Sequence, residues 1–370
     1  MRARYCRVAS MLFLIVFLLE AWPRSCRGVL KGEAEGEVTR VEGRAWVQRE
    51  AEEEREAPLL VGEMLYGGDL ARTEEGSEIQ ISMADGSQLI VRSRSQVKMN
   101  DSRLADGATS SVSLFFGRLW CKVARLAKGR SFHVETPMLV AGVRGTRYEV
   151  ASFDDGTSLV GVEEGEVQVA ADSHEVRVPG GQAVEAEYGM APSQPIRFDG
   201  SSRFWEGWTE RRMNMVPRVL PRVAGKMQER IAHGLETSRK LQGQLLQMTT
   251  QVRQMMEEVV RLRKEGQRPR LRGLRARLQE RRERMKFVLQ RLEQVDNRLA
   301  SAPQMVKKVR DLAERFKEPL GARYHEVLDR IRSIEQDVRL TREVRWENRR
   351  AIQENRRRIQ DLRGTLREMD

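Results

Sequence analysis

Between residues 36 and 184, apolar residues recur at every second position in short runs separated by glycine-containing turns. From Ile79 to Met83 they alternate with polar residues, and Asp85-Gly86 then provides a hairpin turn. Asp155-Gly156 is a second signal of the same kind. No amphipathic helix pattern interrupts these runs. The pattern predicts an all-β sandwich, barrel or roll.

One run of this region changes phase in its middle. Apolar residues occupy even positions over residues 112–116 and odd positions over residues 119–123. A bulge or corner at Gly117-Arg118 would keep both sets on the core face. The second set includes Cys121, which we expect to be a small core residue, because the other two cysteines lie near the N-terminus and leave it no internal disulfide partner.

The stretch from residue 136 to 150 predicts a strand end, a turn and a new strand. Pro137 lacks a backbone donor, so the preceding strand should stop there. Gly142 and Gly145 bracket Arg144 and allow the backbone to bend on either side of it. Arg144 is a candidate partner contact, and the alternative is a structural role in which its guanidinium pairs with a carboxylate or turn carbonyls.

After this turn, Tyr148 and Val150 alternate with Arg147 and Glu149. Alternation of this kind is typical of a half-buried strand with one polar face. Arg147 on the polar face is a second candidate for partner binding.

The residues between 186 and 225 predict a connector. It contains four prolines, which are Pro192, Pro195, Pro217 and Pro221. Phe204, Trp205 and Trp208 form an aromatic cluster in it. We expect this cluster to dock on the β-domain, because clustered tryptophans are usually buried. The alternative is a binding site for a ligand or partner, for which Trp205 and Trp208 are the candidates.

From residue 226 to the end, the period becomes helical and heptads of apolar residues predict a coiled-coil region. A first seam covers residues 241–262, and Gly266 and Pro269 interrupt it. A second seam covers residues 271–299. Because of these breaks, we expect antiparallel helices that fold back on one another rather than one rod.

Two further helices follow in the prediction. Pro303 should start a short helix that runs through Phe316, and Pro319-Gly321 should end it. A last helix from residue 322 to near the C-terminus would be about 70 Å long. Its seam contains polar residues that should weaken packing and fix register or partner choice; they are Thr341, Arg345, Asn348 and Asn355.

The first 28 residues predict a targeting signal. Three arginines precede an apolar run from Val8 to Leu19 that is short for a membrane span. Cleavage before Val29 is the main expectation. Lipidation of Cys26 is an alternative, although Arg24 departs from a bacterial lipobox, and an uncleaved anchor is a third. All three predict a periplasmic or secreted protein.

Charge divides the chain into an acidic and a basic part. Residues 29–200 hold 19 Lys and Arg against 29 Asp and Glu, whereas residues 201–370 hold 42 against 24. A basic helical region is common in nucleic-acid-binding proteins, but the predicted secretion argues against nucleic acid. The expected partners are an envelope protein, an anionic envelope polymer or membrane surface, or the acidic β-domain itself. Self-association through the coiled coil is a further expectation.

Catalytic and metal-binding motifs are missing from the sequence. The four histidines are scattered, and no HxxxH or CxxC spacing occurs. The acidic pairs Asp154-Asp155 and Glu163-Glu164 lie at predicted turns, where such residues are common for backbone reasons. We therefore expect a protein that is not an enzyme and that binds no cofactor or metal.

Six short segments in a fixed order resemble the FecR family of bacterial envelope proteins over about residues 36–185. The segments are Gly62 to Thr73, Ala84-Asp85-Gly86-Ser87, Leu114 to Leu119, Phe132 to Pro137, Val143-Arg144-Gly145-Thr146 and Val162 to Val167. The resemblance implies a periplasmic, non-enzymatic β-domain. Founding members relay a signal from an outer-membrane receptor to a sigma factor through a cytoplasmic segment and a transmembrane helix.

Only seven residues precede the apolar run in this chain, so we expect that cytoplasmic segment to be absent. The predicted organisation is a signal peptide (1–28), a FecR-like β-domain (29–185), a connector (186–225) and a helical coiled-coil region (226–370). The predicted function is binding and scaffolding in the cell envelope. The alternative is a FecR-type signalling relay that acts through a membrane partner.

Overall fold

The computed structural model describes residues 34–50, 55–100, 109–128, 130–171, 174–188 and 190–368. The predicted signal peptide, with its cleavage site and Cys26, lies outside these residues. Among the helices of the described residues, none combines the length and the apolar character that a membrane crossing requires.

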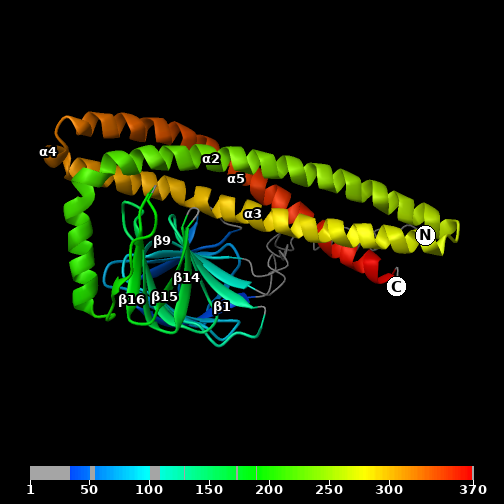
Figure 1. The fold of residues 1–370 in the computed structure, drawn as a ribbon, viewed down its shortest axis with the longest axis horizontal. Coiled ribbons are helices and arrows are strands. Elements are labelled where there is room, and N and C mark those ends of the chain that lie inside the picture. Colours follow the sequence, from blue (N-terminus) through cyan, green and yellow to red (C-terminus); the bar gives the residue numbers. More distant parts are fainter. Residues whose placement is uncertain are drawn as a thin grey trace, which may run out of the picture. The chain divides into compact units, whose positions relative to one another are not determined.

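The described residues from Ala34 to Arg197 form 17 strands in one hydrogen-bonded network of two sheets (Figure 1). Sheet A contains, in spatial order, β4 (Met64–Tyr66), β1 (Ala34–Glu42), β6 (Glu78–Met83), β7 (Gln88–Val91), β9 (Thr109–Lys122), β12 (Arg147–Ser152), β13 (Ser158–Glu164), β16 (Gln182–Ala186) and β17 (Ile196–Arg197). Sheet B contains β3 (Glu56–Pro58), β2 (Ala45–Gln48), β5 (Leu70–Thr73), β8 (Gln96–Met99), β9, β10 (Ser131–Glu135), β11 (Val140–Val143), β14 (Glu166–Ala171) and β15 (His174–Pro179).

Strand β9 belongs to both sheets and changes sheet at Gly117. Its first half pairs with β8 and β10, and its second half pairs with β7 and β12. Gly117 has a φ of 93°, and a Cβ there would lie 2.1 Å from Ser95 Oγ, so only glycine fits this corner. The corner predicted from the phase change is confirmed, and Cys121 is buried in the core as expected.

The predicted turns are also found in the structure. Asp85-Gly86 joins β6 to β7, and Asp155-Gly156 joins β12 to β13. Strand β10 ends at Glu135, just before Pro137. Of the two glycines around Arg144, Gly145 has a positive φ of 133°, whereas Gly142 lies within β11 opposite His133.

Four helices follow the strands in the described residues. They are α2 (Ser202–Lys264), α3 (Arg268–Arg315), α4 (Lys317–Leu320) and α5 (Arg323–Glu368). The fold class is therefore β plus α, as predicted. Gly266 and Gly321 separate helices as expected, whereas Pro319 lies inside the short helix α4.

The start of α2 differs from the prediction. The helix begins at Ser202 rather than at residue 226, so the segment 202–225 is not a connector. Ser201 caps the helix, because its Oγ accepts a hydrogen bond of 3.1 Å from the backbone N–H of Phe204. Pro217 and Pro221 lie inside the helix, and the α2 ribbon turns sharply in its first third (Figure 1). Proline lacks the N–H for the helical hydrogen bond, which accounts for the bend.

The predicted helix start at Pro303 is also wrong, since α3 continues through it to Arg315. The reason is packing: Leu299, Met305 and Val309 around the proline are all buried in the core. Burial of this apolar face outweighs the one helical hydrogen bond that Pro303 removes.

The heptad seams of α2, α3 and α5 close on one another within the chain. One apolar cluster joins Leu241 of α2, Leu292 of α3 and Ile352 of α5. A second cluster, farther along α2, joins Val259, Leu274 and Leu362. Residue numbers rise together along α2 and α5 while they fall along α3. Helix α3 is therefore antiparallel to the other two, which form a bundle with it.

Candidate functional site

The first turns of α2 lie on the outer face of sheet A and form the most extensive polar and aromatic junction of the described residues. Trp205 packs edge-on against Phe198, with ring centroids 5.6 Å apart. Trp208 packs in the same way against Phe153 at 5.9 Å. Both indoles are buried. The structure thus places the two tryptophans against the β-domain, where neither is accessible to a partner.

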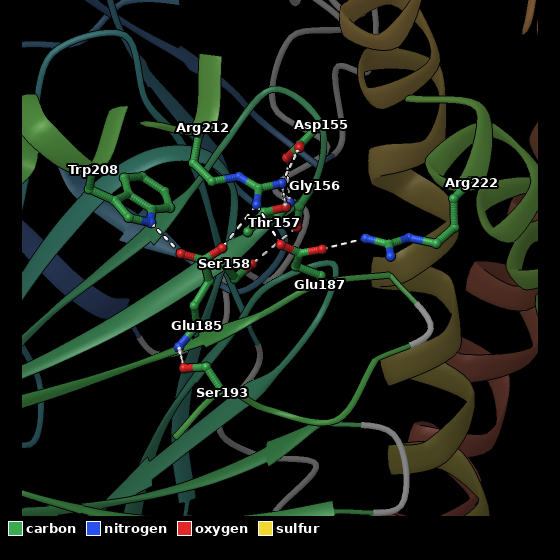
Figure 2. A network of polar contacts seen from close by, with 10 residues as sticks. All are labelled: Asp155, Gly156, Thr157, Ser158, Glu185, Glu187, Ser193, Trp208, Arg212 and Arg222. Carbon is green, nitrogen blue, oxygen red and sulfur yellow. Dashed lines mark hydrogen bonds and ion pairs between the residues drawn. The ribbon is translucent and has the colours of Figure 1, made fainter. Parts of the chain in front are cut away.

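Arg212 lies one turn beyond Trp208 and is the centre of this junction (Figure 2). Its guanidinium donates hydrogen bonds to Asp155 Oδ2 at 2.6 Å and to Thr157 Oγ1 at 2.7 Å. It also donates to Glu185 Oε1 at 3.0 Å and to Glu187 Oε1 at 2.5 Å. One arginine therefore joins the β12–β13 turn, strand β16 and the loop after β16 to α2.

The partners of Arg212 are themselves held in place. Trp208 Nε1 donates to Glu185 Oε2 at 2.7 Å, and Arg222 pairs with Glu187 from beyond the bend in α2 (Figure 2). Asp155 has no exposed surface and accepts the backbone N–H of Thr157 at 2.8 Å. Because Arg212 and Arg222 flank Pro217 and Pro221 and share Glu187, they hold both sides of the bend against the β-domain.

Burial and charge act in opposite directions on these groups. Burial raises the pKa of Glu185, and the hydrogen bond from Trp208 and the charge of Arg212 only partly offset that rise. Burial alone would lower the pKa of Arg212, but the surrounding carboxylates, Asp155 first, outweigh it and the pKa is raised. Arg212 therefore stays charged, and the junction depends on its positive charge.

Glu149 on β12 differs from the prediction of a half-buried strand. It was expected on a polar face, yet it is buried, because α2 covers this part of sheet A. Arg92 Nε and Arg118 Nη1 each lie 3.7 Å from its Oε1, and the Arg118 guanidinium lies 5.1 Å from the Trp205 ring centroid. Burial raises the pKa of Glu149 more than the two arginines lower it.

The two arginines predicted to bind a partner lie apart from the Arg212 junction. Arg144 is exposed in the turn between β11 and β12. Arg147 is exposed at the start of β12 and pairs with Glu164. The structure does not bring either of them together with Trp205 and Trp208, and their role in partner binding stays a prediction.

Sequence reasoning missed Arg212, Glu185 and Glu187, and it took Asp155 for an ordinary turn residue. A usable signal was present, since residues 205, 208 and 212 share one face of a helix. A single arginine on a face with two tryptophans indicates a buried ion pair. The signal was overlooked because the prolines placed this segment in a connector.

A second junction joins α3 to sheet B through mostly neutral groups. Asn297 Nδ2 donates to Asn100 Oδ1 at 3.0 Å, and Lys98 Nζ donates to Asn297 Oδ1 at 2.7 Å. Asn100 in turn donates to Ser113 Oγ at 3.1 Å. Farther along α3, Lys308 pairs with Asp154 at 2.8 Å. Helix α3 therefore contacts sheet B through Asn297 and the β12–β13 turn of sheet A through Lys308, whereas α2 contacts sheet A through Arg212.

The polar seam residues of α5 form a buried layer inside the bundle. Asn348 accepts from Gln242 of α2 at 2.7 Å and donates to Ser238 at 3.1 Å and to Asp296 of α3 at 3.2 Å. Asn355 accepts from Thr249 of α2 at 2.9 Å. Each helix contributes to the layer, so it fixes the register of the three helices within one chain.

The described residues contain no group of three or more His, Cys, Asp and Glu side chains placed to hold a metal ion. The clustered carboxylates of the junction, Asp155, Glu185 and Glu187, are all occupied by arginine. Burial raises the pKa of the Cys121 thiol, so it stays protonated and unreactive. The Arg212 junction is suited to holding α2 against sheet A.

Residues 69–168 match the model of the family described as FecR protein. The chain contains a FecR domain. The match begins just before β5 and ends within β14, so it has the β9 corner near its centre. It lies inside the region that the sequence motifs indicated.

Outside this domain match, the similarity of the chain to known proteins is weak. No curated protein matches the chain. Two crystal structures of a proposed anti-sigma factor from Parabacteroides distasonis are 16% and 17% identical to it, each with a TM-score of 0.32. Each alignment covers 38% of this chain and 63% of that chain, so the match spans less than two thirds of those proteins. A cell surface anchoring domain is 27% identical over 19% of this chain and 91% of its own, with a TM-score of 0.18.

Proposed function

We propose that the chain is a non-enzymatic binding and scaffolding protein of the cell envelope. In this proposal the FecR domain is the binding module, and the bundle of α2, α3 and α5 holds it in a fixed position. The predicted signal peptide and the resemblance of the motifs to periplasmic FecR proteins support the envelope location. The expected partners are an envelope protein, or an anionic envelope polymer or membrane surface.

The fixed attachment of the FecR domain to the helices is the observation that carries the proposal. The Arg212 junction and the Asn297 junction hold two sheets to two helices. The largest apolar cluster also runs without a break from the sheets into α2, α3 and α5. A support of this kind holds a binding module at a constant distance from whatever the far end of the bundle contacts.

Self-association remains part of the proposal but cannot use the heptad seams, which are already buried within the chain. A homo-oligomer would have to form through exposed helix faces. Light scattering of the full chain across a range of concentrations tests this, and a constant monomer mass would remove oligomerisation from the proposal.

The scaffolding function can be tested by cross-linking in cells of the native host. A photo-reactive amino acid is placed at Arg144 in the FecR domain or at Arg270 near the far end of the bundle. Scaffolding predicts that each position captures an envelope component and that the two are recovered in one complex when both positions are labelled. Capture of cytoplasmic proteins alone at both positions would contradict the proposal.

A FecR-type signalling relay is the second candidate, and the match over residues 69–168 supports it. It predicts that deletion of the gene changes transcription of a neighbouring receptor gene. Unchanged transcript levels would exclude the relay and leave the scaffold in place.

A further inference from the structure

Helix α3 carries five arginines at intervals of seven residues, one position before each member of its apolar seam. They are Arg270, Arg277, Arg284, Arg291 and Arg298, called here the arginine row. All five are exposed. Because seven residues are close to two helical turns, the five side chains project from one edge of α3.

The arginine row is regular and largely unneutralised. At a rise of 1.5 Å per residue, successive guanidinium groups are about 10.5 Å apart and the row is about 42 Å long. Within the described chain, Arg270, Arg277, Arg284 and Arg291 form no ion pair with a carboxylate, and Arg298 lies beside Glu135, whose pKa is raised by burial. Two acidic residues lie between Arg277 and Arg284: exposed Glu280, and Glu283, which pairs with Arg282 and Lys286.

The row leads into a cavity of about 580 Å³ between α2, α3 and the FecR domain. Arg291 and Arg298 line the cavity, and Arg230 of α2 faces them across it. Arg230 is positioned by the FecR domain, since its guanidinium lies 5.5 Å from the Tyr188 ring centroid. Buried Ile231 and Leu299 give the cavity an apolar wall. Its volume is in the range of ordinary ligand pockets.

The spacing of the row indicates which anion it fits. Duplex DNA carries one charge per about 1.7 Å, which is far denser than one arginine per about 10.5 Å. A flat bilayer cannot enter the cavity in which the row ends. A flexible polymer with sparse, regular anionic groups can follow the row and place its end in the cavity.

We propose that the arginine row and the cavity bind an acidic polysaccharide that carries one carboxylate per disaccharide. The guanidinium groups of Arg270, Arg277, Arg284 and Arg291 each pair with a carboxylate through two parallel N–H···O bonds. The cavity takes the end of the polysaccharide, with Arg230 and Arg298 adding positive charge to its lining. This inference names one partner for the proposed scaffolding function and rests on it for the envelope setting alone.

The test is binding of the full chain to fluorescently labelled hyaluronan, a polymer with one carboxylate per disaccharide, followed by anisotropy. The variant Arg277→Gln/Arg284→Gln/Arg291→Gln is expected to bind about 10-fold or more weakly, because exposed charge pairs contribute modestly one by one and add along a row. A hyaluronan oligosaccharide too short to span two arginines is expected to bind more weakly than the polymer.

The matched control removes the same charge elsewhere. Arg323→Gln/Arg339→Gln/Arg342→Gln changes three exposed arginines of α5, and its affinity is expected to stay within about 2-fold of the unchanged chain. Equal losses in both variants would overturn the inference in favour of unspecific charge attraction. No binding of hyaluronan, or tighter binding of duplex DNA or anionic vesicles, would also overturn it. None of these outcomes affects the cross-linking test of the scaffold.

Discussion

The two junctions between the helices and the FecR domain use different chemistry. At sheet A, Arg212 is surrounded by three carboxylates and buried with Asp155. At sheet B, Asn297 and Asn100 share amide hydrogen bonds with a single lysine beside them. Removal of one partner leaves a buried charge at the first junction, whereas at the second it leaves an unpaired amide and a half-buried lysine. We therefore expect a substitution at the first junction to lower the free energy of unfolding strongly, and a substitution at the second junction to lower it less.

The charged contacts between the helices and the β-domain also account for part of the charge asymmetry of the chain. An acidic β-domain and basic helices meet at Arg212 with Asp155, Glu185 and Glu187, and again at Lys308 with Asp154. The acidic domain is thus one partner of the basic region, as the sequence allowed. Four members of the arginine row, Arg270, Arg277, Arg284 and Arg291, lie outside these contacts and form no ion pair with a carboxylate of the described residues.

The largest expected effect is the loss of Arg212. Arg212→Met should lower the free energy of unfolding by about 3–5 kcal/mol, because Asp155 would remain as an uncompensated buried charge. Urea unfolding of the full chain measures it. Arg211→Met, at the exposed neighbouring position, is the control and should have little effect. Equal stability of the two variants would mean that the junction is not the attachment we describe.

A smaller effect is expected at the turn that presents Asp155. In Gly156→Ala the new Cβ would lie 2.4 Å from the Tyr188 ring at a φ of 85°, and the expected cost is about 2–4 kcal/mol. Gly181→Ala has a similar φ of 79° with no atom within 4 Å, so it reports backbone strain alone. Thermal unfolding of both separates strain from packing, and equal costs would show that the turn does not pack tightly.

The neutral junction should respond less. Asn297→Leu leaves Asn100 and Lys98 without one hydrogen-bond partner and should cost about 1–2 kcal/mol. Gln279→Leu changes an exposed amide of the same helix and serves as the control. If Asn297→Leu cost as much as Arg212→Met in urea unfolding, the contrast between the two junctions would be lost.

The smallest effect is a pH dependence that comes from buried carboxyl groups. Burial raises the pKa of Glu149 and Glu185 above the ordinary value of 4.5. The folded state then binds protons more tightly than the unfolded state, so their stabilising contribution is complete below 4.5 and is lost as the pH rises through the raised values. Glu149→Gln should flatten this decline in urea unfolding as the pH is raised above 4.5, and exposed Glu166→Gln should not. An unchanged slope in Glu149→Gln would contradict it.

Much of the fold follows from local rules that the sequence displays. The period-two runs and the Asp-Gly turns identify the strands, and the phase change at Gly117 identifies the corner of β9. The heptad seams identify the bundle. These features could be predicted because each depends on residues that are neighbours in the chain.

The errors arise where tertiary packing overrides a local signal. Pro217, Pro221 and Pro303 are helix breakers by propensity, yet burial of the surrounding apolar faces keeps all three inside helices. Glu149 has the alternation of an exposed residue, but a helix from another part of the sequence covers it. The Arg212 junction depends on contacts across 25 to 57 residues, so the shared helix face of residues 205, 208 and 212 indicates a buried ion pair but does not identify its partners.

The buried amides of the bundle have a consequence for length. If α5 slipped by seven residues toward the far end, Asn355 would enter the apolar cluster around Leu362 and leave Thr249 behind. Intermediate displacements are excluded because they would turn the seam away from its partners. The bundle therefore cannot be stretched or shortened gradually. It thus has one fixed length, and its far end stays at a constant distance from the FecR domain.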